Sequence, residues 1–390
     1  MECFDISERA FRVANFSELK NYALIDLSAL ADNYARVRRL AGGRRVICVV
    51  KADAYGHGTQ RCVRRLAECG ADFFAVSSIE EALEVRIAAP SARVLIFGYV
   101  PSESIPRAAA DRMILTVYDR ESAERISAAL PVGESVEVHF KLNTGMNRLG
   151  FPTDEASLGG TVDEIIRLAA SPALRPSGIY THFAASDSPD SPLSRRQHAR
   201  FSAALEALRA RGLSLESHAA ASSGILLGDA AGDDAVRAGL LLWGLPPFAE
   251  ASLEGFRPVM SLWSRAAEVF RLSPGETVSY GGTFRAEREM TVATLSLGYA
   301  DGLLRAATGA SLRIHGKDCR ILGRICMDQF MIDAGELDIA CGDFVPVFDP
   351  DGINVARLAA QAETINYELV SGVGLRVPRI YTDREENGKR

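Results

Sequence analysis

Short apolar runs alternate with stretches of helical periodicity through the first two thirds of the chain. Eight of these runs have the composition of strands that are buried on both faces, at residues 46–51, 73–77, 93–98, 114–117, 136–143, 178–183, 218–222 and 235–239. Amphipathic segments such as 77–89 and 197–212 lie between most of them. Eight strands that alternate with helices predict an α/β fold, a parallel (β/α)8 barrel of the TIM type.

The pattern changes from about residue 256 to close-set strands with glycine-rich turns, as in "TVSYGGTF", "MTVATLSLGY", "CRILGRICMDQFMID" and "DFVPVFD". This texture predicts a mainly antiparallel β domain, interrupted by one helix over 355–372. A strand at 22–27 would be a ninth barrel strand, so we assign it to the second domain. The predicted division is a barrel over 29–255 and a β domain formed by 1–28 together with 256–390.

Composition narrows the class of protein. The 390 residues are 47% hydrophobic and 24% charged, as in globular proteins, and the net charge of -6 disfavours nucleic acid or anionic membrane as a partner. No secretory signal and no run long enough to span a membrane are visible. Seven cysteines without a CxxC pair indicate reduced thiols, and the six histidines have no zinc-type spacing. We therefore expect a cytoplasmic enzyme without a metal site.

Polar residues stand at or near the ends of several predicted barrel strands. They are Lys51, Lys141, His182, Ser222 and Arg237. Active sites of such barrels lie at the C-terminal ends of the strands. A single strand-end lysine is usually a surface residue whose amine reaches water, and a single histidine usually belongs to the core. Five polar residues on one barrel face instead indicate an active site at the barrel mouth.

A desolvated lysine at this position suits Schiff-base chemistry with an aldehyde cofactor. Pyridoxal 5'-phosphate (PLP) fits, because it also needs a phosphate cradle and a partner for its pyridine nitrogen. The "SSG" segment at 222–224 can supply a hydroxyl and backbone amides. The "VRAGLLLWG" segment places Arg237 near the cofactor and offers further amides at Gly239 and Leu240.

The sequence resembles the bacterial alanine racemases, which are fold-type III PLP enzymes. The blocks that carry the resemblance are "VVKADAYGHG", "KLNTGMNRLG", "THFA", "VRAGLLLWG", "SLGYADG", "GRICMDQFMID", "TINYELV" and "RVPRIY". The resemblance implies interconversion of L-alanine and D-alanine, which supplies D-alanine for peptidoglycan. It also implies a head-to-tail homodimer in which the β domain of each subunit supplies the second base to the partner subunit's site.

The resemblance gives each matching position a role. Lys51 resembles the Schiff-base lysine, which is also one of the two catalytic bases, and Tyr299 resembles the second base. Tyr55, Tyr367 and Ser222 resemble phosphate ligands. The backbone amide of Met327 matches the group that binds the substrate carboxylate.

Four further positions match the family's site. Arg148 resembles the residue that contacts the cofactor's phenolic oxygen and the substrate carboxylate. Lys141 matches a position that is carboxylated in many members; a plain lysine facing solvent is the alternative. The resemblance also implies a chain from Tyr299 of one subunit through His182 to Arg237 of the other.

Physical reasoning supports these roles. Racemisation removes a proton from one face of Cα and returns one to the other, which suits two bases on opposite faces. Arginine does not give up its proton, so Arg237 would leave the pyridine nitrogen neutral and limit transamination and decarboxylation. A related decarboxylase would be expected to carry an acidic residue there. A non-catalytic PLP-binding protein would not need the β domain with Tyr299 and Met327.

The chain also departs from the family's pattern. Asn143 stands where aspartate is frequent, Ala221 where asparagine is usual, and Trp243 where tyrosine is common. These departures bear on fine geometry and substrate preference, so racemisation of serine or of a broader set of amino acids stays open.

Overall fold

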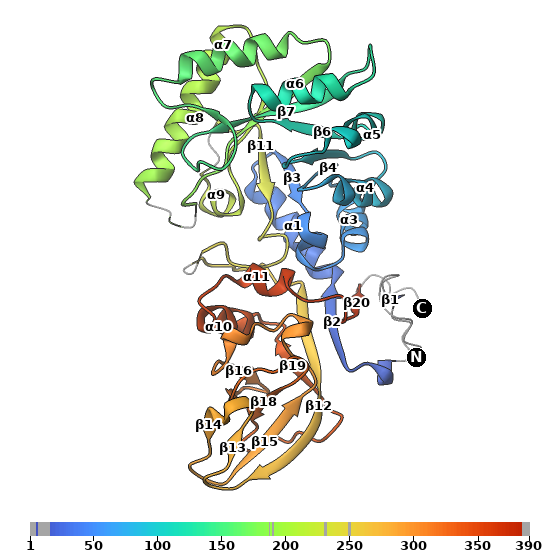
Figure 1. Cartoon of the computed structure of the whole chain (residues 1–390), viewed down its shortest axis with the longest axis vertical. Coiled ribbons are helices and arrows are strands. Elements are labelled where there is room, and N and C mark those ends of the chain that lie inside the picture. Colours follow the sequence, from blue (N-terminus) through green and yellow to red (C-terminus); the bar gives the residue numbers. More distant parts are fainter. Residues whose placement is uncertain are drawn as a thin grey trace.

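The first sheet is a parallel barrel whose strands follow one another around the ring in chain order (Figure 1). The computed structural model describes residues 5–6, 16–186, 188, 191–229, 232–248 and 251–383. The barrel strands are β3 (Arg45–Val49), β4 (Phe73–Val76), β5 (Arg93–Ile96), β6 (Ile114–Val117), β7 (Val136–Asn143), β9 (Leu174–Tyr180), β10 (Glu216–His218) and β11 (Ala235–Ala238). A parallel ladder joins β11 to β3, and backbone N–H groups of Asp234 and Arg237 donate to Ser217 and Ala220, each at 2.9 Å, between β11 and β10. The predicted barrel is confirmed.

Helices surround this barrel and bury the apolar faces that the sequence pattern predicts (Figure 1). Strands β4, β6 and β11 are buried along their whole length, as parallel strands covered on both faces require. The helices are α1 (Leu27–Leu40), α2 (Lys51–Tyr55), α3 (Thr59–Glu68), α4 (Ile79–Ala88), α5 (Ile105–Ala110), α6 (Arg120–Ala129), α7 (Leu158–Ala169), α8 (Pro192–Ala210) and α9 (Ser222–Leu227). The two-residue strand β8 (Phe151–Pro152) extends β7 on its edge.

The second sheet is mainly antiparallel and is organised around the long strand β12 (Met260–Leu272). Strand β2 (Asn21–Asp26) pairs with the first part of β12, and β15 (Met290–Leu295) pairs with the second part. The other members are β1 (Asp5–Ile6), β16 (Ser311–Ile314), β17 (Lys317–Leu322), β18 (Phe330–Asp333), β19 (Phe344–Phe348) and β20 (Arg379–Thr382). A separate hairpin joins β13 (Thr277–Val278) and β14 (Phe284–Arg285). Short 3-10 turns are η1 (Phe16–Glu18), η2 (Ser102–Ser104), η3 (Tyr280–Gly282), η4 (Tyr299–Asp301) and η5 (Arg305–Ala307).

The structure corrects two expectations and adds one long strand. The single helix expected at 355–372 is two helices, α10 (Ile353–Gln361) and α11 (Asn366–Ser371), because Glu363 has a left-handed φ of 53° that ends the helical path. The expected strand at 218–222 ends at His218, so Ser222 begins α9 instead. Sequence analysis did not identify β12, although it is the longest strand described.

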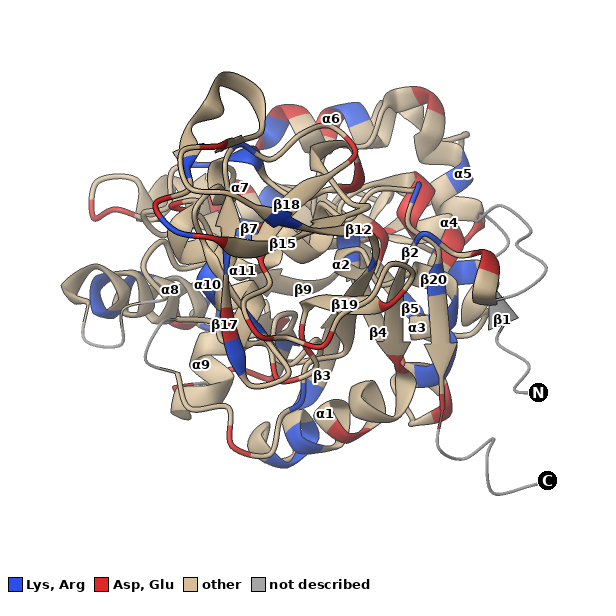
Figure 2. Ribbon diagram, turned by 90° about the horizontal axis from the view of Figure 1, so that it is seen from below, with Lys and Arg blue, Asp and Glu red and all other residues tan. Residues whose placement is uncertain are grey.

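Several predictions concern the chain as a whole. Residues 1–4, 7–15 and 384–390, which the predicted division gives to the second domain, lie outside the described residues. Basic and acidic residues are interspersed on the elements that Figure 2 shows. The six cysteines within the described ranges are free thiols. None of the helices described is both long and apolar enough to cross a membrane.

Candidate functional site

A cavity of about 590 Å³ opens at the C-terminal ends of the barrel strands. Most of the residues that sequence analysis singled out line it: Lys51, Tyr55, Lys141, Arg148, His182, Ser222, Arg237, Gly239, Leu240 and Tyr367. Tyr367 comes from α11, far along the chain from the barrel strands. A volume of this size suits a small-molecule ligand.

The strand expected at 46–51 ends at Val49; Lys51 comes after Val50 and begins a left-handed turn. Ala52, Asp53, Ala54 and Tyr55 all have φ between 51° and 55°. Each non-glycine residue in this conformation costs about 1–2 kcal/mol, so other contacts must hold the turn. Strain of this kind is concentrated at functional sites, and here it directs both Lys51 and Tyr55 into the cavity.

The carboxylate of Glu81 holds the lysine turn from the neighbouring helix. Its two oxygens accept hydrogen bonds from the backbone N–H groups of Ala52 and Ser77, each at 2.7 Å. Burial lowers the pKa of Lys51 from its ordinary value; the charge of Arg148 lowers it further and the charge of Glu81 opposes the shift. Lys51 is therefore more readily neutral than a lysine in water, as a nucleophile or base must be.

One end of the cavity presents a hydroxyl and closely spaced backbone. Oγ of Ser222 accepts from the backbone N–H groups of Gly239, at 3.1 Å, and Leu241, at 3.4 Å. A Cβ on Gly239 would lie 2.9 Å from Oη of Tyr55, so glycine is what lets this tyrosine reach the backbone. Burial raises the pKa of Tyr55, which keeps its hydroxyl a donor. The hydroxyl groups of Ser222 and Tyr55 can each donate to a phosphate group.

Arg237 is buried at the cavity wall, and the protein accepts most of its donors. Nη1 donates to the backbone oxygen of His218 at 2.5 Å and contacts Nδ1 of its ring at 2.9 Å. Nη2 donates to backbone oxygens of Thr181 and Ala219, both at 2.8 Å, and lies 3.3 Å from Nδ1 of His182. Among the described residues, Nε has no hydrogen-bond partner, so this donor is left for a ligand. Burial lowers the pKa of Arg237 to about 10, so the guanidinium stays charged at neutral pH.

Lys141 is buried on the same wall. Its Nζ lies 5.1 Å from the centre of the Tyr180 ring, and Cζ of Arg237 lies 5.6 Å from the same centre. Lys141 forms no ion pair with any residue that the structure describes. Burial, followed by the charges of Arg237 and Arg148, lowers the pKa of Lys141 to about 7. This lysine is therefore partly neutral at physiological pH.

Sequence analysis missed Tyr180 and the buried histidine His139. Tyr180 lines the cavity and stacks on His218, with ring centres 4.8 Å apart. The signal was present in the strand period, because residues two apart point to the same face. Tyr180 stands two residues before His182, and His139 two before Lys141.

Tyr299 and Met327 do not line this cavity. They lie on the β domain, 44% and 52% exposed, respectively. Backbone hydrogen bonds from Tyr299 to the oxygen of Cys326, at 3.1 Å, and from Ala300 to that of Met327, at 3.0 Å, hold the two segments together. A Cβ on Gly298 would lie 2.3 Å from the Met327 oxygen, so glycine is required for this approach. The two candidate residues thus form one unit on the β domain, outside the lining of their own chain's cavity.

Fold and site together define a class of protein: a barrel enzyme with lysine and arginine around a small-molecule cavity, joined to an antiparallel β domain. Residues 25–247 match the family model for the alanine racemase N-terminal domain, and residues 259–381 match that for the C-terminal domain. The chain therefore belongs to the alanine racemase family.

Curated relatives and solved structures agree with this assignment. The chain is 36% identical to the alanine racemase of Desulfovibrio desulfuricans, over 93% of this chain and 98% of that protein. It is 37% identical to that of Methanococcus maripaludis, over 92% and 98%. The crystal structure of the Streptomyces lavendulae enzyme has a TM-score of 0.88 at 32% identity, covering 95% of this chain and 99% of the other. The Streptomyces coelicolor enzyme has a TM-score of 0.87 at 34% identity, covering 94% and 99%.

Proposed function

We propose that the protein interconverts L-alanine and D-alanine with PLP in the barrel cavity, using Lys51 and Tyr299 as two bases. Family membership supports the reaction. The observation that carries the cofactor assignment is the joint placement of Lys51, Arg237 and the Ser222–Gly239 cradle around one cavity. PLP, when bound, accepts electron density from the substrate Cα and so acidifies its proton.

The residues present fit this cofactor. Lys51 supplies the amine that would hold its aldehyde carbon. Ser222 and Tyr55 beside Gly239 supply hydroxyl groups where a phosphate would lie. Nε of Arg237 donates to none of the residues that the structure describes, so it can donate to a neutral ring nitrogen. Because arginine keeps its proton, this pairing favours racemisation over transamination and decarboxylation.

Lys51 would accept the Cα proton on one face of the substrate. Its pKa is lowered mainly by burial, so a larger fraction of the amine is neutral than for a lysine in water. Arg148 also lines the cavity and would orient the substrate carboxylate as a bidentate donor.

The second base would come from the partner. In a head-to-tail homodimer, Tyr299 of the partner subunit would reach the opposite face of Cα, and Met327 of the partner subunit would offer its backbone amide to the carboxylate. The exposure of both residues in one chain supports this arrangement. His182 accepts from Arg237 through Nδ1, so when neutral it carries its proton on Nε2. That N–H would then be available to the partner's Tyr299.

Lys141 would be carboxylated. The neutral amine attacks carbon dioxide, forms an N–C bond and releases one proton, which leaves a carbamate anion. The lowered pKa of Lys141, to about 7, supports this reaction, because only the neutral amine has a free electron pair. The anion would replace repulsion between Lys141 and Arg148 by an ion pair that holds the arginine.

The deciding experiment incubates L-alanine with the PLP-loaded protein in deuterated water. Proton NMR follows the Cα signal, and chiral chromatography follows the product. Loss of the Cα proton together with D-alanine is the expected result. Exchange without inversion would contradict the role of Tyr299. If alanine showed no exchange and serine were turned over, the proposed substrate would be serine instead. Release of carbon dioxide would overturn the racemase proposal in favour of a decarboxylase.

A further inference from the structure

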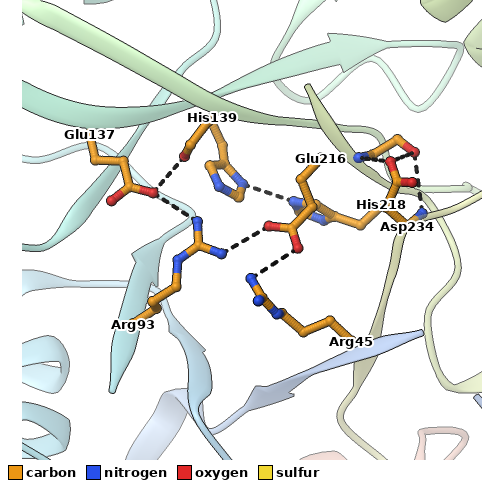
Figure 3. Close-up of polar contacts among 9 residues, drawn as sticks. Arg45, Arg93, Glu137, His139, Glu216, His218 and Asp234 are labelled. Atoms are coloured by element: carbon orange, nitrogen blue, oxygen red, sulfur yellow. Dashed lines mark hydrogen bonds and ion pairs between the residues drawn. The ribbon is translucent and has the colours of Figure 1, made fainter. Parts of the chain in front are cut away.

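A network of hydrogen-bonded side chains runs from Arg237 in the site into the barrel interior. Nη1 of Arg237 lies 2.9 Å from Nδ1 of His218, and Nε2 of His218 lies 2.9 Å from Nδ1 of His139. Both histidines are fully buried, and the rings face one another in Figure 3. The Tyr180 ring stacks on His218 with an interplanar angle of 7°, which fixes the plane of that ring.

The direction of these hydrogen bonds follows from the donors. A guanidinium only donates, so Nδ1 of His218 must accept and carries no proton. A neutral His218 then has its proton on Nε2 and donates it to Nδ1 of His139. His139 in turn carries its proton on Nε2. With Arg237 as a fixed donor at one end, both ring tautomers can be assigned.

Burial keeps the two rings neutral, and positive charge at both ends acts in the same direction. Burial lowers the pKa of His139 to about 3, and the charge of Arg93 acts in the same direction. Burial, then the charge of Arg237, lowers the pKa of His218 well below its ordinary value. Arg93 lies at the other end of the barrel, where it forms ion pairs with Glu137 at 2.7 Å and Glu216 at 2.9 Å (Figure 3).

At the inner end of this hydrogen-bond network, His139 destabilises the fold. Nε2 of His139 is buried without a hydrogen-bond partner among the described residues, and a buried unpaired donor is destabilising. The barrel also makes room for the ring, because a Cβ on Gly178 would lie 2.4 to 2.5 Å from three of its atoms. An apolar side chain here would leave no buried donor unpaired, so the histidine points to a task.

We propose that His139 is a positioning residue for the reaction proposed above. By accepting from His218, it holds that ring in the tautomer that accepts from Arg237. The guanidinium is then fixed between His218 and the carbonyl groups of Thr181 and Ala219, with Nε left for the cofactor ring nitrogen. His139 itself does not touch the cavity.

The first test reads the tautomers directly in the cofactor-free protein. Long-range proton–nitrogen NMR on protein labelled with [15N]histidine distinguishes the two neutral tautomers of each ring, and single substitutions assign the six histidines. We expect His139 and His218 to carry their protons on Nε2 across pH 6 to 8. A proton on Nδ1 of His218 would overturn the proposal whatever the activity.

The second test compares His139→Leu with Phe73→Leu. Phe73 packs its ring edge-on against His139, with centres 6.0 Å apart, and is equally buried, but it takes no part in the hydrogen-bond chain. His139→Leu is expected to lower kcat by about tenfold to 10²-fold, as for a misplaced catalytic group, with KM little changed. It should also change the absorbance spectrum of the bound cofactor. Phe73→Leu should do neither.

His139→Gln is the conservative variant and guards against misfolding of the leucine variant. Its side-chain oxygen can accept from His218, so it should retain the kcat and the His218 tautomer. Equal kcat in folded His139→Leu and Phe73→Leu, or loss of kcat in His139→Gln with the tautomer intact, would overturn the positioning role. A wild-type protein that does not racemise alanine would refute the proposed function instead, and leaves the tautomer test standing.

Discussion

The hydroxyl of Tyr55 occupies the space beside Gly239 that a side chain would need: a Cβ on that glycine would lie 2.9 Å from Oη. Residue 55 reaches this place only because four consecutive residues adopt left-handed φ values after Lys51. The lysine and the proposed phosphate cradle are thus coupled through one short turn.

Gly239→Ala should therefore weaken PLP binding more than it weakens folding. The new methyl group would displace Tyr55 from the cradle, so we expect the Kd for PLP to rise about tenfold, or ~1.4 kcal/mol. Fluorescence titration of the cofactor-free protein measures it. Gly159→Ala in α7 is the control, because, apart from the helix's own backbone, no atom of the described residues lies within 4 Å of the added Cβ; it should leave Kd unchanged and raise stability slightly. Equal Kd values in the two variants would contradict the cradle.

Glu81→Gln tests how the lysine turn is held. A glutamine side chain has one acceptor oxygen, so the backbone N–H of either Ala52 or Ser77 loses its partner. We expect a stability loss of about 1 kcal/mol and a further fall in the pKa of Lys51, since the charge of Glu81 raises that pKa. The pH dependence of PLP binding and the thermal midpoint report these effects. Glu80→Gln, next to it on the same helix and exposed, should change neither; a matching change there would remove the role of Glu81.

Acid should destabilise the fold below about pH 6.5. Burial lowers the pKa of His57 to about 4 and those of His139 and His182 to about 3, whereas an unfolded histidine titrates near 6.5. Between these values the unfolded chain binds more protons, so stability falls as pH falls, by up to about 1.4 kcal/mol per pH unit for each histidine. Urea unfolding from pH 8 to 4 measures the slope. His139→Gln should reduce it by one proton, and an unchanged slope would show that His139 is protonated in the fold.

Carboxylation of Lys141 should increase as the pH rises. Because the pKa of Lys141 is lowered to about 7, the reactive neutral amine prevails above this pH. With 13C-bicarbonate present, a carbamate carbon signal should grow from pH 6 to pH 8 in 13C NMR. Lys141→Met should abolish the signal, while Lys317→Met, at an exposed lysine, should keep it. A signal that survives Lys141→Met belongs elsewhere.

Local pattern was enough to predict most of the barrel, because its strands are buried on both faces and read as continuous apolar runs. It was not enough for β12, whose surroundings change along its length from buried to exposed, so neither strand period nor apolar run dominates. The break between α10 and α11 depends on the left-handed conformation of Glu363. A glutamate in the sequence does not predict this conformation.

Some residues of the site could also be predicted from the sequence, and others could not. Lys51, Lys141 and His182 follow from barrel geometry, since strand ends meet at one mouth. Tyr180 and His139 were missed because aromatic and histidine residues inside a strand are usually core. Their roles appear only when rings from three strands are seen stacked and bonded to Arg237.

The sharing of sites between subunits can be decided with two inactive variants. Lys51→Ala and Tyr299→Phe should each lower racemisation by 10²-fold or more, about the contribution of a general base. If each site takes Lys51 from one chain and Tyr299 from the other, a heterodimer of the two variants has one intact site and one doubly defective site. Carrying different tags and purified on both, it should recover about half of the wild-type activity per dimer.

The inverse pairing is the matched control. Both substitutions are placed in one chain, which is paired with a wild-type chain and purified in the same way. With shared sites, each site now lacks one base, so this heterodimer should be inactive although it contains the same four side chains. If instead each chain formed its own site, the doubly substituted pairing would keep half of the activity and the first pairing would have none. Shared sites therefore predict activity only in the first heterodimer, and separate sites predict activity only in the second. Neither comparison depends on how well a single variant folds.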